Sequence, residues 1–222
     1  MDVFVIGAAG GVGRRLGAIL AERGDRVSGL HRKAEQAETV AASGATAIAG
    51  DLIADSIEEL AEKIAGHDAV VFSAGAHGTG KDQTSLIDGK GLEKAADAAI
   101  QAGVSRFVLV SAFRDSARTA GLGEGFAHYL WVKKQAEIYL TRTSLDWIIL
   151  RPGHLLDEPG DGLVTAGLAV EDRDIRRDNL AEFIATALHE PALSRTIVEI
   201  TDGHTPIAEA VSTVARSVGP RH

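Results

Sequence analysis

The feature that most constrains the fold is a short apolar run followed by regularly spaced glycines near the start of the chain. Residues 3–6 read Val-Phe-Val-Ile, a run short enough to be only a buried strand. Glycines follow at positions 7, 10 and 13, and an amphipathic pattern then continues to about Arg23. A strand, a glycine-rich turn and a helix in this order predict a corner that binds phosphate groups.

Each glycine of this turn has a separate expected task. Gly7 lets the chain leave the strand, Gly10 lets phosphates reach the backbone, and Gly13 lets the helix lie close to the sheet. The N–H groups at the helix start, around Gly11 and Val12, face the phosphates with the positive end of the helix dipole. The spacing predicts a dinucleotide site, and a glycine-rich turn without a ligand is the alternative.

Composition limits the class of protein. The 222 residues contain no linker or repeat, so we expect a single domain over residues 1–222. The net charge of −8 argues against a nucleic-acid partner, and no apolar run is long enough to span a membrane. The chain has no cysteine, which fits a cytoplasmic protein, and its scattered histidines predict no metal site. The expected partner is a small-molecule substrate, and the oligomeric state stays open.

Six further apolar runs alternate with helical patterns, which predicts a doubly wound parallel sheet of about seven strands, a Rossmann fold. These runs cover residues 26–30, 46–49, 69–73, 106–110, 147–150 and 197–200. A long helix is expected over 84–102, with Gly89 and Gly91 inside it. Short paired strands are expected near 163–165 and 174–176, and Asp178 is expected to cap the helix that ends near His189.

The residues after the second and third strands bear on the choice of cofactor. Positions 26–34 hold no acid for a ribose 2′-hydroxyl, whereas Arg32 and Lys33 suit a 2′-phosphate. We therefore expect NADP, with NAD less favoured, and a solvated basic pair as the alternative. Asp51 and Leu52 follow the third strand, where the carboxylate either accepts a bond from the adenine amino group or caps the turn.

Other strand ends are expected to border the same cofactor. Ala74 and Gly75 follow the fourth strand, and Pro152 and Gly153 end the sixth. Loops around 76–84, 112–126 and 154–177 are expected to build the substrate region, because loops carry specificity on such scaffolds.

A tyrosine and a lysine share one face of a later helix. Tyr129 and Lys133 are four residues apart, so an ammonium lies one turn from a phenol and favours its ionised form. Such a phenol can exchange a proton with a substrate oxygen. Ser111 stands at the carboxyl end of the fifth strand, on the same edge of the sheet. A buried tyrosine with a solvated lysine is the alternative interpretation.

These motifs together resemble the atypical short-chain dehydrogenase/reductases, in the NAD(P)H-binding branch with NmrA-like and flavin/biliverdin-reductase-like proteins. The resemblance extends over nearly the whole chain, and the segments that carry it are residues 7–13, 50–52, 102–108, 110–111, Tyr129 with Lys133, and 151–153. The resemblance implies a cofactor along the carboxyl ends of the strands. It also implies that Ser111 bonds a substrate carbonyl, that Tyr129 is the acid/base, and that Lys133 bonds the nicotinamide ribose and tunes Tyr129.

Two departures from that family bear on function. Larger members carry a relay asparagine in the helix over 84–102, whereas the single asparagine here is Asn179, and the gap from Ser111 to Tyr129 is longer. The favoured hypothesis is an NADP(H)-dependent oxidoreductase that moves hydride between nicotinamide and a small carbonyl, quinone or flavin-like acceptor. The alternative is a non-catalytic NADP-binding redox sensor that acts through a protein partner.

Overall fold

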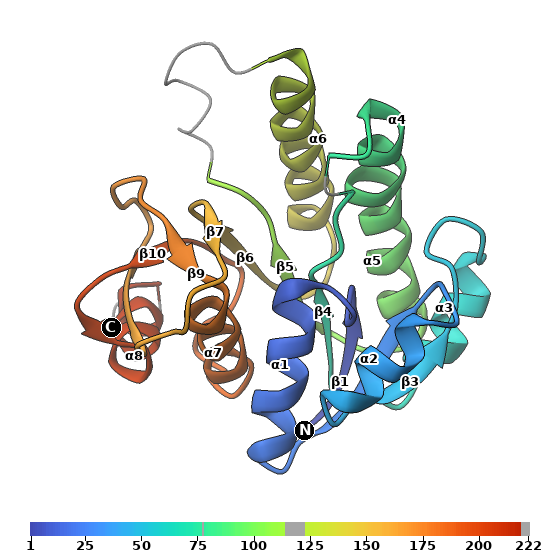
Figure 1. The fold of residues 1–222 in the computed structure, drawn as a ribbon, viewed down its shortest axis with the longest axis horizontal. Helices are drawn as coiled ribbons and strands as arrows, with labels where there is room; N and C mark the ends of the chain where they lie inside the picture. The colour runs from blue at the N-terminus through green and yellow to red at the C-terminus, as the bar shows by residue number, and fades with distance from the viewer. Residues whose placement is uncertain (77, 114–122, 219–222) are drawn as a thin grey trace.

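The computed structural model describes residues 1–76, 78–113 and 123–218. The strands are β1 (Asp2–Ile6), β2 (Arg26–His31), β3 (Thr46–Ala49), β4 (Ala69–Phe72), β5 (Arg106–Val110), β6 (Asp146–Pro152), β7 (Leu155–Leu156), β8 (Leu163–Gly167), β9 (Ile175–Arg176), β10 (Thr196–Asp202) and β11 (Thr205–Pro206). The helices are α1 (Gly11–Glu22), α2 (Gln36–Ala42), α3 (Ile57–Ile64), α4 (Lys81–Thr84), the π-helix η1 (Ser85–Gly91), α5 (Leu92–Gln101), α6 (Glu124–Thr141), α7 (Arg177–Leu188) and α8 (Ile207–Val218). Strands and helices alternate along the first half of the chain (Figure 1).

The main sheet has the strand order β11-β8-β10-β6-β5-β4-β1-β2-β3. From β3 to β10 all neighbours are parallel, which confirms the expected doubly wound fold. The expected count of about seven strands is too low, because antiparallel β8 and β11 extend the sheet to nine. The strand order changes direction between β1 and β4, and this switch point opens a crevice at the carboxyl ends of the strands.

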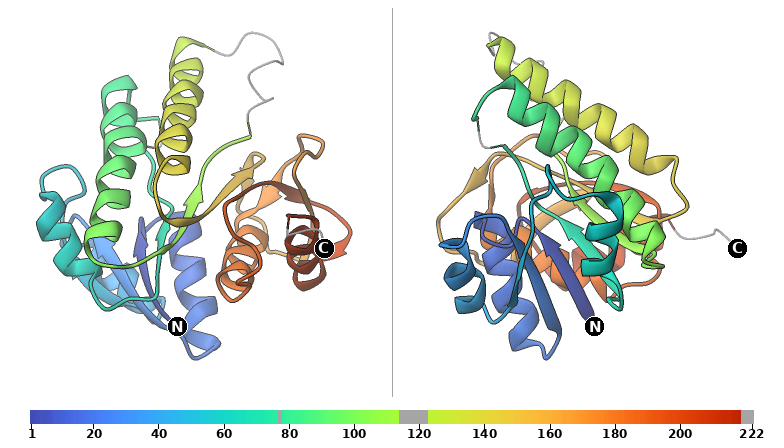
Figure 2. Two further views of the ribbon diagram at one scale, coloured as in Figure 1. Left: turned by 180° about the vertical axis from the view of Figure 1, so that it is seen from behind. Right: turned by 90° about the vertical axis from the view of Figure 1, so that its right-hand side faces the viewer.

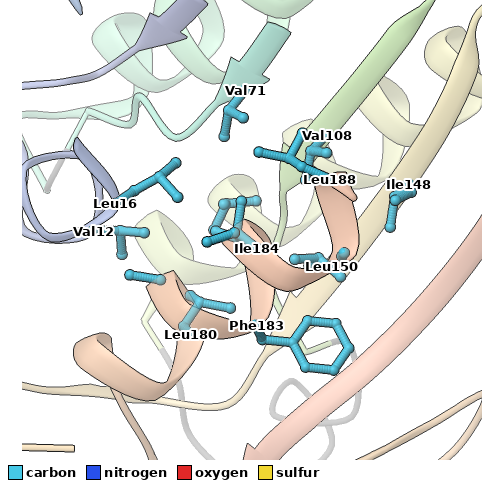
Figure 3. Close-up of a cluster of buried hydrophobic side chains, with 14 of the residues drawn as sticks. Val12, Leu16, Val71, Val108, Ile148, Leu150, Leu180, Phe183, Ile184 and Leu188 are labelled. Carbon is cyan, nitrogen blue, oxygen red and sulfur yellow. The ribbon is translucent and has the colours of Figure 1, made fainter. Parts of the chain in front are cut away.

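Two apolar cores, one on each face, hold the helices to the sheet. Alternate side chains of the strands point to opposite faces, so Val3 and Val5 join one core and Phe4 and Ile6 the other. Helices α1 and α7 cover the first face and α5 and α6 the second (Figure 2). Figure 3 shows the first core, where Leu16 of α1 and Ile184 of α7 meet the strands. Across the described ranges, no helix has both the length and the apolar character to cross a membrane.

The helix expected over residues 84–102 is divided in three. Helix α4, η1 and α5 follow one another directly, and the wider π turns of η1 include both predicted glycines. A Cβ atom on Gly91 would lie 2.7 Å from Cδ2 of Leu52, and one on Gly89 would lie 3.2 Å from Cγ1 of Val132. The glycines therefore allow the loop after β3 and helix α6 to pack closely on η1.

Two local expectations near the C-terminus are wrong. Strands β8 and β9 do not pair with each other, because β8 pairs with β10 and β11 while β9 pairs with β7. Helix α7 begins at Arg177 with Arg176 at its N-cap position, so Asp178 is inside the helix. Asp178 instead accepts a hydrogen bond from the Gly160 N–H at 3.0 Å and pairs with Arg15.

Candidate functional site

Two connected cavities lie at the carboxyl edge of the sheet, around the glycine-rich turn. The first, here called the β2 cavity, has a volume of about 330 Å³ and reaches the ends of β2 and β3. The second, here called the β5 cavity, has a volume of about 590 Å³ and reaches the end of β5 and helix α6. Both are lined by Gly10, Ser73, Ala74 and Gly75, so they are neighbouring parts of one cleft at the glycine-rich turn.

Most of the residues predicted for the site line this cleft. In the β2 cavity these are Gly7, Gly10, Arg32, Asp51, Leu52, Ala74 and Gly75. In the β5 cavity they are Gly10, Gly11, Val12, Ala74, Gly75, Ser111, Tyr129 and Lys133. Lys33, Gly13, Pro152 and Gly153 are outside the linings of both cavities.

The glycine-rich turn has the close contacts that its sequence predicts. Gly7 has a φ of +93°, a conformation that favours glycine, and a Cβ atom there would lie 2.6 Å from the Ala74 nitrogen. A Cβ atom on Gly13 would lie 2.3 Å from the Gly7 carbonyl oxygen, so α1 packs directly on the turn. Among the described residues, no side chain caps α1, and its first turn has no acid. Its N-terminal N–H groups are therefore available to an anion.

The β2 cavity combines apolar walls with a few polar groups. Gln36 accepts hydrogen bonds from the N–H groups of Arg32 at 3.2 Å and Lys33 at 3.0 Å, which fixes the backbone after β2. The Arg32 side chain is exposed at the cavity edge, whereas the Lys33 ammonium lies 3.8 Å from Glu35. The Asp51 carboxylate caps the turn by accepting a hydrogen bond from the Ile53 N–H at 2.8 Å, and Asp51 also lines the cavity.

Two of the predicted residues instead make close contacts elsewhere. Gly153 donates its N–H to Ile200 at 3.1 Å, and a Cβ atom on it would lie 1.7 Å from the Arg173 carbonyl oxygen. Pro152 is buried and its carbonyl accepts the Phe113 N–H at 3.0 Å. This segment therefore ties β6 to β10 and to the loop before β9.

A buried ion pair supports the tyrosine on α6. The Lys133 ammonium lies 2.9 Å from Oδ1 of Asp88, donates to the Val110 carbonyl at 3.1 Å, and is 5.7 Å from the centre of the Tyr129 ring. Burial opposes its charged form, but the neighbouring Tyr129 and Asp88 outweigh burial and raise the pKa of Lys133 above its ordinary value. Lys133 is therefore a fixed cation at the floor of the β5 cavity.

Ser111 belongs to a second buried network. Its hydroxyl donates to Oε1 of Glu137 at 2.7 Å, and Arg151 donates to the same carboxylate at 3.1 and 2.7 Å. A hydroxyl has one proton, so Ser111 in this arrangement presents only lone pairs to the cavity. Donation to a substrate carbonyl, as the resemblance implies, requires the bond to Glu137 to break.

Three residues of the site were not identified from the sequence. Glu137 follows Tyr129 and Lys133 at the same four-residue spacing, a signal that was available. Asp88 carried no comparable signal, because a π-helix turns it toward Lys133. Asp88 occupies the helix region where the resemblance called for an asparagine. Arg177 lines the β5 cavity from α7, far away in the sequence.

Some expectations fall outside the described residues. These are the part of the 112–126 loop at positions 114–122, and position 77 of the 76–84 loop. Within residues 1–76, 78–113 and 123–218, no three or more His, Asp or Glu side chains are grouped to hold a metal ion.

This chain is similar to known proteins over most of its length. A family model described as NAD(P)H-binding matches residues 7–191. The uncharacterized sugar epimerase YhfK of Bacillus subtilis is 38% identical over 213 residues, which are 95% of this chain and 99% of that protein. Among solved structures, a Bacillus halodurans protein named for the NAD-dependent epimerases/dehydratases has a TM-score of 0.88 at 34% identity, covering 96% of this chain and 99% of its own. The oxidoreductase ylbE of Lactococcus lactis has a TM-score of 0.86 at 26% identity, with both chains covered in full, at 100%.

Proposed function

Since this chain belongs to the NAD(P)H-binding family, we propose that it is an NADP(H)-dependent oxidoreductase that reduces a small carbonyl, quinone or flavin-like acceptor. The observation that carries the proposal is the position of Tyr129 and Lys133. Both line the β5 cavity, which joins the glycine-rich turn through Gly10, Ala74 and Gly75. A phenol and a buried ammonium thus border the space next to a dinucleotide corner.

The residues that line the two cavities suit the separate parts of a dinucleotide. The open N-terminus of α1 suits the diphosphate, and the β2 cavity suits an adenosine. The exposed Arg32 guanidinium at the cavity edge suits a 2′-phosphate, which supports NADP over NAD. The nicotinamide then belongs in the β5 cavity, where, when bound, it supplies or accepts a hydride.

The residues of the β5 cavity supply the proton for such a step. Tyr129 would give its hydroxyl proton to the carbonyl oxygen of a substrate, and the Lys133 ammonium would stabilise the resulting phenolate. Asp88 keeps Lys133 in place and charged. Ser111 accepts a hydrogen bond from a donor group of the substrate or cofactor, because its hydroxyl already donates its one hydrogen bond to Glu137.

The cavity wall favours an apolar acceptor. Much of the lining consists of glycines and of apolar side chains that include Val12, Val110, Phe126 and Leu155. A sugar needs many hydrogen-bonding partners, whereas a quinone or flavin ring needs mainly apolar contact. The name of YhfK points to sugar epimerisation, and this wall composition is our reason for preferring reduction of a flat acceptor.

Nucleotide binding tests the cofactor assignment. NADPH and NADH are titrated by nicotinamide fluorescence against the wild type, Arg32→Ala and the control Lys90→Ala, whose exposed side chain pairs with Glu93 at 2.7 Å. We expect tighter binding of NADPH than of NADH, and loss of that preference in Arg32→Ala only. Equal binding of both nucleotides in wild type and variant would contradict the assignment to NADP.

Turnover tests the chemistry. NADPH oxidation is followed with a panel of quinones, flavins and aldehydes, and Tyr129→Phe is compared on each acceptor that the wild type reduces. Loss of aldehyde reduction in Tyr129→Phe supports the proton donor, while full activity on aldehydes contradicts it. NADPH binding without turnover, with clearly different affinities for NADP⁺ and NADPH, would favour a redox sensor. Interconversion of sugar isomers without net NADPH consumption would favour an epimerase.

A further inference from the structure

Arg177, the first residue of α7, lies against the first residue of α1. A Cβ atom on Gly11 would lie 2.8 Å from Cδ and 2.9 Å from Nε of Arg177, so the guanidinium stem covers the glycine-rich turn directly. Arg177 also lines the β5 cavity together with Gly10, Gly11 and Val12. A cation from the C-terminal half of the chain thus stands beside the N–H groups of α1.

One nitrogen of Arg177 fixes its orientation and two remain available. Nη1 donates to the Leu155 carbonyl at 3.1 Å and lies 3.1 Å from the Asp157 carboxylate. Among the described residues, no acceptor is bonded to Nε or Nη2. The side chain is 21% exposed, so the free nitrogens are partly shielded from water. Such shielding strengthens a charge-assisted hydrogen bond to an anion.

We propose that Arg177 is a cofactor-binding residue that clamps the diphosphate of the dinucleotide against the N-terminus of α1. The N–H groups of α1 bind one side of the diphosphate, and Nε and Nη2 of Arg177 bind the other. This inference rests on the proposed function only in placing a dinucleotide in the cleft, and it makes no use of Tyr129 or of turnover.

The test separates the two phosphate sites with partial ligands. ADP-ribose carries the diphosphate without a 2′-phosphate, and adenosine 2′-monophosphate carries the 2′-phosphate without a diphosphate. Each displaces NADPH in a fluorescence competition with wild type, Arg177→Gln and Arg32→Gln. We expect Arg177→Gln to raise the Kd of ADP-ribose and NADPH about tenfold and to leave that of adenosine 2′-monophosphate unchanged. Arg32→Gln gives the reverse pattern for the two partial ligands.

Two further variants keep the result interpretable. Arg173→Gln removes the same charge from the same segment, at a side chain that is 64% exposed and pairs with Glu171, and it leaves every Kd unchanged. Arg177→Lys keeps the charge but not the paired donors, and gives an intermediate Kd for ADP-ribose.

Three results would overturn the inference. The first is an unchanged Kd of ADP-ribose in Arg177→Gln with NADPH still bound, which leaves the proposed function intact. The second is an equal loss of adenosine 2′-monophosphate binding, which means that Arg177 acts through the fold. The third is failure of the wild type to bind NADPH or ADP-ribose, which removes the proposed function as well.

Discussion

The Lys133 ammonium and the Asp88 carboxylate form an ion pair at 2.9 Å, with side chains only 6% and 0% exposed. Asp88 is held from its other side by the Ala76 N–H, which donates to Oδ2 at 3.0 Å. The pair joins η1, α6 and the backbone after β4. Its charges are taken out of water together, so the removal of one partner leaves the other buried and uncompensated.

Breaking this pair from one side is therefore costly. Asp88→Asn leaves the Lys133 ammonium without its counter-charge, and we expect the free energy of unfolding to fall by about 3 kcal/mol or more. The double variant Asp88→Asn/Lys133→Met removes both charges and recovers much of that loss. Urea unfolding of the four proteins in this cycle measures the coupling. The pair Lys90–Glu93 is the control, because Lys90 is 74% exposed and Lys90→Gln changes stability by less than about 1 kcal/mol. Additive effects at Asp88 and Lys133 would show that the two side chains do not interact.

The same pair predicts a loss of stability at alkaline pH. Burial opposes the charge on Lys133, yet Tyr129 and Asp88 together raise the pKa of Lys133 above its ordinary 10.5. A raised pKa in the folded state stabilises the fold fully below the unfolded pKa, and this contribution is lost as pH rises through the folded pKa. Urea unfolding at about pH 9 and about pH 12 should show a larger loss for the wild type than for Lys133→Met. A parallel loss in both proteins would contradict the assignment.

The parts of the site that depend on local sequence were predictable. Gly7, Gly10 and Gly13 form the turn that their spacing predicts, because strand, turn and helix are continuous in the chain. Tyr129 and Lys133 share the cavity because a regular helix places positions four apart on one face.

The remaining parts depend on contacts between distant segments. Asp88 reaches Lys133 through a π-helix, and nothing in residues 84–102 alone indicates that irregular turn. The place of Gly153 at a strand end predicts that it borders the cofactor, whereas its close contact with the Arg173 carbonyl depends on a segment 20 residues further along the chain. Arg177 reaches Gly11 across the sheet edge, a relationship visible only after α1 and α7 are packed together.

Ser111 and Tyr129 should differ in their importance for turnover. The Ser111 hydroxyl donates a hydrogen bond to Oε1 of Glu137, with 2.7 Å between the two oxygens. Ser111→Ala therefore removes a hydrogen-bond acceptor from the cavity and not the proton donor. On an aldehyde that the wild type reduces, we expect Tyr129→Phe to lower kcat/KM about a hundredfold or more, and Ser111→Ala by less than about tenfold. Equal losses in the two variants would mean that Ser111 donates to the carbonyl after all.

Gly13→Ala should damage the corner itself. The added methyl group would lie 2.3 Å from the Gly7 oxygen and 2.7 Å from Cα of Ala8, both backbone atoms. We expect the free energy of unfolding to fall by about 1–3 kcal/mol and NADPH binding to weaken. Gly167→Ala is the control, because a Cβ atom there would lie 3.5 Å from Cγ1 of Val170, an ordinary van der Waals distance. Thermal unfolding and NADPH fluorescence decide the outcome, and equal behaviour of the two variants would contradict the close packing of α1 on the turn.

Tyr139 gives a spectroscopic prediction that is independent of any substrate. Its hydroxyl donates to Asp97 at 2.7 Å, and this bond, with a smaller contribution from burial, raises the pKa of Tyr139 from 10.0 to about 12. The stabilisation from this bond is present below pH 10 and is lost as pH rises through the folded value. The chain has two tyrosines, so an ultraviolet absorbance titration of the wild type should contain one step near pH 12 that is absent in Tyr139→Phe.

Asp97→Asn is the second variant in the tyrosine titration. With an uncharged acceptor, the Tyr139 phenol loses its proton at a lower pH. We expect the step of Tyr139 to move toward pH 10 in this variant. An unmoved step would assign the alkaline transition to another cause, such as unfolding, which circular dichroism over the same pH range would reveal.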